Sequence, residues 1–295
     1  MKKLFALVLL PVIFYSCSNK SENQSDAAED TTSTEIVEPV TPTLTKVWET
    51  DTVLTTAEST LYDEANEIIY VSNINGNHSE KDGNGFISKI APDGSVIQLQ
   101  WVAGLNAPKG MAILNDKLYV TDMDEIVEIN IADSSIANRY PVEGATFLND
   151  AATDGEKVYV SDSGTGKVHV LEDGKVNTVT EGMEGINGLA FNDAGELFIL
   201  NGEGLLQYDM EGDTATTLND VVTGGDGLVI IDDSTYIASR WQGEIYLVKG
   251  GKEYLLLDTK AEESNTADID YIAEENLVLV PTFMKSKVVA YELEY

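Results

Sequence analysis

One strand-like segment recurs six times between residues 46 and 295, and each copy is an apolar or aromatic run that closes near a polar residue. The copies lie at 69–73, 118–122, 158–162, 197–201, 236–240 and 278–282. Their second residues are spaced 49, 40, 39, 39 and 42 residues apart, the first interval being lengthened by an insertion at 75–85. A period near forty residues with several short strands per unit is typical of propeller blades. The sequence therefore predicts an all-β, six-bladed β-propeller.

The strands of one blade are visible in the fourth unit, where we expect them at 188–192, 197–201, 205–209 and 214–218. Asp-Gly pairs at 93–94 and 173–174 mark third-to-fourth-strand hairpins of other units, because such turns need a positive φ. The last unit ends at Tyr295 after its third strand. Residues 46–50 would supply the missing fourth strand and close the ring, which leaves no exposed sheet edge there.

A polar residue opens the first strand of every unit, 10 to 12 residues before the second residue of the recurring segment. The six are Glu58, Lys109, Asn149, Asn187, Asp226 and Asp268. Equivalent positions of a closed ring face the same axis, so this pattern predicts a polar ring at one mouth. The alternative is a chance placement of polar residues, since turn entries favour Asn and Asp. Glycine follows Lys109, Asn187 and Asp226, and it either admits a ligand close to the backbone or only makes a turn.

A second polar ring follows from the antiparallel pairing expected between the first two strands of a blade. The end of the second strand then lies beside the start of the first. The residues concerned are Asn73, Asp122, Asp162, Asn201, Arg240 and Thr282. Two polar rings at one mouth favour a ligand site, and the alternative is a channel that only water fills.

Four short motifs occur in a fixed order: Ala57–Asp63 (AESTLYD), 147–150 (FLND), 186–191 (INGLAF) and 225–228 (GDGL). In this order and spacing they resemble the motifs of gluconolactonase and regucalcin-like six-bladed propellers. The resemblance implies that Glu58, Asn149, Asn187 and Asp226 hold one divalent metal, and that Asp226 is also the catalytic base for an attacking water. All four side chains offer oxygen, which favours Ca²⁺, with Mg²⁺ or Mn²⁺ as alternatives.

The activity implied by this resemblance is metal-dependent hydrolysis of a small, sugar-like lactone or ester. From their positions in the two rings, the predicted substrate contacts are Lys109, Asp122, Asp162, Arg240 and Asp268. The family often has an arginine two residues before its Asn-Asp motif, where this chain has Phe147. The alternative is therefore a propeller without catalysis that presents its loops to a protein or glycan partner.

The N-terminus has the pattern of an export signal, with a basic start, an apolar run over 4–15 and the pair Ser16-Cys17. This pattern resembles a bacterial lipobox. It predicts a signal peptide at 1–16 and a lipid on Cys17 that anchors the chain to a membrane of the cell envelope, facing the periplasm or the surface. An ordinary cleaved signal with an incidental cysteine is the alternative. Residues 17–45 are rich in Ser, Thr, Glu and Pro and are expected to be a disordered tether before the propeller at 46–295.

The net charge of the chain disfavours some classes of binding partner. Acidic residues outnumber basic ones by 51 to 18, a net charge of −33, which disfavours nucleic acid. The chain also lacks the Lys and Arg clusters that bind anionic lipid directly. The expected partner is therefore a small-molecule substrate, and nothing in the sequence defines an oligomeric state. With Cys17 as the single cysteine, no intrachain disulfide exists, so packing must stabilise the fold.

Overall fold

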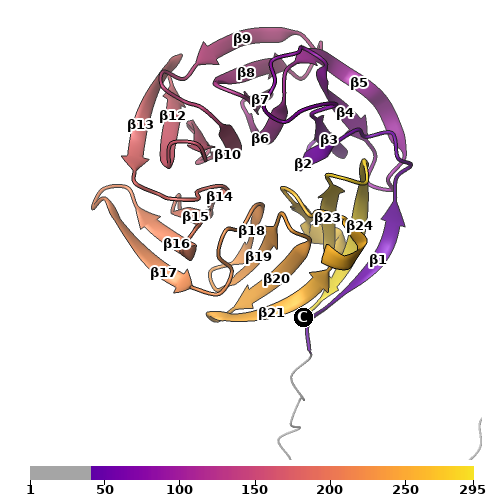
Figure 1. Cartoon of the computed structure of the whole chain (residues 1–295), viewed down its shortest axis with the longest axis vertical. Helices are drawn as coiled ribbons and strands as arrows, with labels where there is room; N and C mark the ends of the chain where they lie inside the picture. Colours follow the sequence, from indigo (N-terminus) through magenta and orange to yellow (C-terminus); the bar gives the residue numbers. More distant parts are fainter. Residues whose placement is uncertain (1–40) are drawn as a thin grey trace, which may run out of the picture. The chain divides into compact units, whose positions relative to one another are not determined.

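The computed structural model describes residues 41–295. The predicted signal peptide, the lipid site Cys17 and the tether up to residue 40 lie outside the described residues. Within 41–295 the chain forms strands β1 to β24, which make six four-stranded antiparallel sheets around a central axis (Figure 1). The predicted six-bladed propeller is confirmed. No helix in this part of the chain is long and apolar enough to cross a membrane.

Each of the first five blades uses four consecutive strands, numbered from the axis outward. Blade 1 is β2 (Ala57–Asp63), β3 (Ile68–Asn73), β4 (Gly85–Ile90) and β5 (Val96–Leu105), and blade 2 is β6 (Pro108–Leu114), β7 (Lys117–Asp122), β8 (Glu125–Asn130) and β9 (Ile136–Pro141). Blade 3 is β10 (Leu148–Thr153), β11 (Val158–Asp162), β12 (Lys167–Glu172) and β13 (Lys175–Glu181). Blade 4 is β14 (Leu189–Phe191), β15 (Leu197–Asn201), β16 (Gly204–Asp209) and β17 (Thr214–Asn219), and blade 5 is β18 (Leu228–Asp232), β19 (Thr235–Arg240), β20 (Glu244–Lys249) and β21 (Lys252–Asp258).

Blade 6 joins the two ends of the described chain. It consists of β22 (Asp270–Ile272), β23 (Leu277–Thr282), β24 (Lys287–Glu294) and, outermost, β1 (Thr43–Glu49). β1 pairs antiparallel with β24, with Thr43 opposite Glu294 and Glu49 opposite Val289. The predicted closing strand is therefore confirmed, and it begins at Thr43 rather than Lys46. Two short 3₁₀ turns, Lys260–Glu262 and Ala273–Glu275, precede and follow β22.

The hydrophobic core lies between blades. Phe198 and Leu200 of β15, for example, share a cluster with Tyr236 and Ala238 of β19 in the next blade. The second strands are buried on both faces because each blade is covered by a neighbour on either side, which explains why they read as continuous apolar runs in the sequence. This packing fixes the inner strands, and with them the residues that face the axis.

Candidate functional site

The six residues of the first predicted ring all stand where an inner strand begins. Glu58, Lys109 and Asn149 lie at the starts of β2, β6 and β10, and the other three come just before β14, β18 and β22. Five of the six line one cavity of about 210 Å³, together with four aromatic side chains. The cavity is formed by Glu58, Lys109, Asn149, Asn187 and Asp226 with His78, Phe147, Trp241 and Phe283. The structure thus brings together all four side chains that the resemblance assigns to a metal.

The hydrogen bonds of the two amides leave their oxygen atoms available to a cation. Asn187 donates from Nδ2 to Oδ1 of Asp226 at 2.7 Å, and Asn149 donates from Nδ2 to Oγ of Ser163 at 3.3 Å. Oε2 of Glu58 is buried and has no hydrogen-bond partner among residues 41–295. A buried carboxylate oxygen without a partner is costly unless a cation or a proton satisfies it.

Four buried carboxyl groups gather at the axis, and burial raises the pKa of each. The pKa of Asp226 rises to about 7, although the hydrogen bond from Asn187 opposes the shift. The pKa of Glu58 is raised well above its usual value, first by burial and then by the charge of Asp226. Burial also raises the pKa of Asp150 to about 7 and that of Asp268 well above its usual value. A cation bound at this place would offset the cost of ionising these carboxyl groups.

Asp150 is a member of this cluster that the sequence reasoning did not select as a site residue. Its Oδ2 accepts a hydrogen bond from the backbone N–H of Leu189 at 2.5 Å, and its Oδ1 accepts one from the N–H of Ala151 at 2.6 Å. The first bond ties blade 3 to blade 4. The only sequence signal was its place in the Asn-Asp motif directly after Asn149.

Lys109 brings a positive charge to the cavity wall. Its side chain is only 1% exposed, and Nζ donates to the carbonyl oxygens of Ala107 at 3.1 Å and His78 at 3.5 Å. Nζ also lies 4.4 Å from the ring centroid of Phe147. Burial lowers the pKa of Lys109, while the charges of Glu58 and Asp122 oppose that shift. The ammonium group is held by backbone and ring, so it faces the cavity beside the acids rather than closing an ion pair.

Two aspartates of the second predicted ring hold loops. Asp122 accepts the backbone N–H groups of Asn106 at 2.9 Å and Ala107 at 2.8 Å, just before β6. Asp162 does the same before β10, where it accepts the N–H groups of Thr146 and Phe147 at 3.2 and 3.0 Å. Neither carboxylate lines the cavity. Each one fixes the loop that delivers the inner strand of a blade.

Arg240 and Asp268 also lie outside the cavity lining. Arg240 pairs with Glu244 at 3.1 Å, and Asp268 accepts the hydroxyl of Ser59 at 2.6 Å. Of the five predicted substrate contacts, Lys109 is the one that the structure places in the cavity.

We expect Asp162→Asn to lower stability and not substrate affinity. The amide nitrogen that replaces one carboxylate oxygen cannot accept, so at least one backbone N–H of residues 146 and 147 loses its partner. Such a loss costs about 1–3 kcal/mol. Thermal unfolding should show a melting temperature lowered by several degrees, with the dissociation constant of any cavity ligand unchanged. An unchanged melting temperature together with weaker ligand binding would instead restore Asp162 as a substrate contact.

The glycines that follow three ring residues serve packing between blades. A Cβ on Gly110 would overlap the backbone of Asp150, one on Gly188 the carbonyl of Asp226, and one on Gly227 the backbone of Ile269. None of the three needs a positive φ. These glycines let adjacent inner strands approach each other closely, which keeps the ring narrow.

The donor set of the cavity suits a hard cation. Residues 41–295 contain no cluster of three or more His, Cys, Asp and Glu side chains arranged to hold a metal. The cavity offers two carboxylates and two amides instead, all oxygen donors of the kind that Ca²⁺ and Mg²⁺ accept. The unsatisfied Oε2 of Glu58 fits such an ion.

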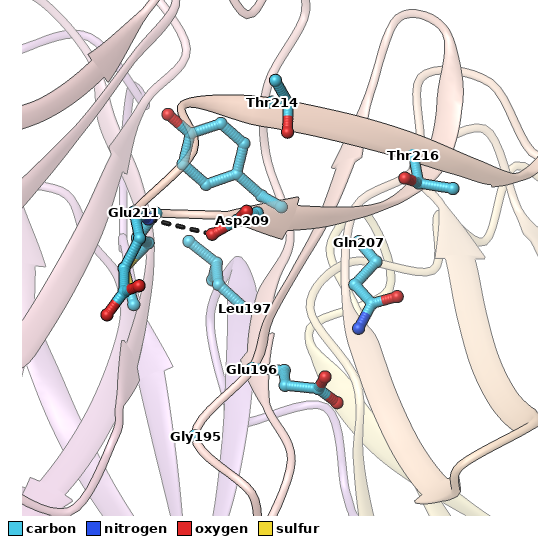
Figure 2. A pocket seen from close by; sticks show the side chains of 10 residues that line it. Gly195, Glu196, Leu197, Gln207, Asp209, Glu211, Thr214 and Thr216 are labelled. Atoms are coloured by element: carbon cyan, nitrogen blue, oxygen red, sulfur yellow. Dashed lines mark hydrogen bonds between the residues drawn. The ribbon is translucent and has the colours of Figure 1, made fainter.

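A larger cavity, of about 470 Å³, lies on blade 4 away from the ring (Figure 2). It is lined by the turn before β15 and by residues of β16 and β17, and its acidic side chains include Glu196, Asp209 and Glu211. Figure 2 shows Oδ1 of Asp209 accepting the backbone N–H of Glu211, at 3.0 Å. It contains none of the ring residues, so the smaller central cavity is the better candidate for chemistry.

Comparisons with known proteins support the fold. No protein-family model matches the chain, and no curated protein matches its sequence. A putative gluconolactonase structure is similar, with 14% identity over 87% of this chain and 93% of that chain and a TM-score of 0.64. A catalytically inactive virginiamycin B lyase of Staphylococcus aureus, solved with quinupristin, is 10% identical over 86% of this chain and 99% of that chain, with a TM-score of 0.58. A chain of a nidogen–laminin complex is 13% identical over 70% of this chain and 88% of that chain, with a TM-score of 0.55. At these identities the likeness shows a shared propeller fold.

Proposed function

We propose that the central cavity binds one divalent cation, Ca²⁺ in the first instance, and hydrolyses a lactone or ester. The observation that supports this most directly is the meeting of Glu58, Asn149, Asn187 and Asp226 in one 210 Å³ cavity. One of these oxygens, Oε2 of Glu58, is buried without a partner. The fold likeness to a putative gluconolactonase agrees with this reaction class.

The chain's own residues divide the work. A bound divalent cation supplies polarisation of the substrate carbonyl and a lower pKa for water. Asp226 accepts the proton of the attacking water. The 2.7 Å hydrogen bond from Asn187 fixes the orientation of that carboxylate. Lys109 on the wall stabilises negative charge that develops on a substrate oxygen.

The second candidate is a binding propeller for a protein or glycan. The observation in its favour is the apolar surface beside the cavity, where Trp241 is 40% exposed and Met284 61%. Large exposed apolar side chains that gather at one place mark interaction sites. The likeness to a chain from a nidogen–laminin complex shows that a related fold occurs in a protein complex.

Calorimetric titration with Ca²⁺ tests the first proposal. We expect one site per chain in the wild type, and a loss of affinity of about 100-fold or more in Glu58→Gln/Asp226→Asn, because ligand charge largely sets calcium affinity. The matched control is Glu196→Gln/Glu211→Gln, which removes two carboxylates from the blade 4 cavity and should leave the site intact. If Ca²⁺, Mg²⁺ and Mn²⁺ all fail to bind the wild type, the metal-dependent hydrolase is excluded and the binding propeller remains.

A further inference from the structure

The lining of the central cavity includes four aromatic side chains, which form two pairs. His78 and Phe147 meet edge to face with ring centroids 5.8 Å apart, and Trp241 and Phe283 meet in the same way at 5.6 Å. Edge-to-face pairs of this kind hold each other in place. These four side chains, the aromatic wall, offer ring surface to a ligand in the cavity.

The repeat explains where this wall comes from. The residue directly after the second strand of each blade is, in chain order, Ile74, Met123, Ser163, Gly202, Trp241 and Phe283. Blades 5, 6, 1 and 2 thus carry apolar side chains at this position, and blades 3 and 4 carry small ones. Ile74 and Met123 are buried in a cluster against which Phe283 packs. One side of the mouth is an apolar arc, and Phe283 has a rigid support behind it.

The apolar arc continues outward past Trp241. This residue lines both the central cavity and a neighbouring one of about 640 Å³, which also includes Met284. Asn265, which also lines the neighbouring cavity, donates from Nδ2 to the carbonyl oxygen of Trp241 at 2.9 Å. A ligand whose reacting group fills the 210 Å³ cavity therefore has room for a substituent across the indole ring.

The neighbouring cavity has charged side chains of both signs, Lys260, Glu263 and Lys285, so it does not select for a substituent of either sign. Where a substituent meets Trp241 and Phe283, the lining is apolar. A neutral apolar group buries its surface there without the cost of desolvating a charge.

We propose that the substrate is a lactone or ester with a neutral apolar substituent, a flat ring or a branched alkyl group, that packs against Trp241 and Phe283. This inference rests on the proposed hydrolase function and narrows its substrate class. It replaces the sugar-like substrate expected from the sequence with an apolar one. The carbonyl group lies toward Asp226, and the substituent lies on the arc formed by blades 5 and 6.

Binding of lactams separates this inference from catalysis, because a cyclic amide has the shape of a lactone and resists hydrolysis. Calorimetry would compare an unsubstituted γ-lactam with its phenyl, tert-butyl, trimethylammonium and hydroxymethyl derivatives. We expect the phenyl and tert-butyl compounds to bind most tightly to the wild type. Trp241→Ala and Phe283→Ala should each weaken these two by about tenfold and weaken the unsubstituted lactam far less, because it has no substituent to pack on the two rings. The control, Leu255→Ala, removes an apolar side chain that is 52% exposed on β21 and should change nothing.

Three results would overturn the inference: equal binding of substituted and unsubstituted lactams, tighter binding of the hydroxymethyl compound, or tighter binding of trimethylammonium than of the isosteric tert-butyl group. The last result would mean that Trp241 and Phe283 bind a cationic group rather than a neutral apolar one. Lactone turnover, measured separately, distinguishes the two proposals. Lactam binding that depends on Trp241, without turnover of any lactone, would exclude the hydrolase alone. Turnover with the same KM for substituted and unsubstituted lactones in wild type and Trp241→Ala would exclude the apolar substrate alone.

Discussion

Asp226→Asn is expected to reduce kcat by roughly 10³-fold or more on any lactone that the wild type hydrolyses. An amide cannot accept the proton of the attacking water, and positioned general bases contribute about 10² to 10⁴ in rate. The same substitution weakens a ligand of the proposed cation. The geometry should survive, because the oxygen of an asparagine at 226 can still accept the hydrogen bond that Asn187 donates at 2.7 Å in the wild type.

Steady-state kinetics at saturating Ca²⁺ measure this loss. The matched control is Asp270→Asn, another buried carboxyl group, whose pKa burial raises to about 6 and which accepts the N–H of Tyr62 at 2.5 Å outside the cavity. Its kcat should stay within about twofold of the wild type, since an amide oxygen can accept the same bond. An Asp226→Asn enzyme that keeps more than a tenth of wild-type kcat would remove Asp226 from the role of base.

The fold was predictable because the propeller is periodic in sequence as well as in space. Second strands such as 197–201 are buried on both faces, so each blade leaves an apolar run at nearly the same interval. The closing strand followed from counting, since the last unit lacked its fourth strand. The first ring was predictable for the same reason. Residues at one repeat position, such as Glu58 and Asn149, occupy equivalent places around the axis and so line the same cavity.

The second ring shows the limit of this reasoning. Asp122 and Asp162 occupy a repeat position near the mouth, but their carboxylates turn to the backbone N–H groups of the preceding loops. A sequence does not show whether an aspartate caps a loop or faces a ligand, because both roles select the same residue type. The aromatic wall was missed for a different reason. Trp241 and Phe283 follow the strands rather than belonging to them, and Phe147 was considered only as a missing arginine.

The buried acids should make the metal-free protein less stable as pH rises, and Asp226→Asn should remove part of that effect. The folded-state pKa of Asp226, about 7, lies above its ordinary value of 3.8. The contribution of this group to stability is therefore fully present below pH 4 and is lost as pH rises through 7. At pH 8 in a chelator we expect Asp226→Asn to be more stable than the wild type by on the order of a few kcal/mol. For a domain of this size that is a gain of roughly 5–10 °C in melting temperature.

The difference between the two proteins should shrink toward zero near pH 4, and comparing them cancels groups of opposite sign such as His169, whose pKa burial lowers. Glu196→Gln, in the blade 4 cavity, should have the same melting temperature as the wild type at every pH. Ca²⁺ at pH 8 should raise the melting temperature of the wild type more than that of Asp226→Asn, because the substitution weakens binding of the ion to the folded state. A variant less stable than the wild type at pH 8 without metal would mean that the Asp226 carboxylate stabilises the empty ring. The ring would then be a structural element. The repulsion between its closely spaced carboxylates would no longer be a reason to expect a bound cation.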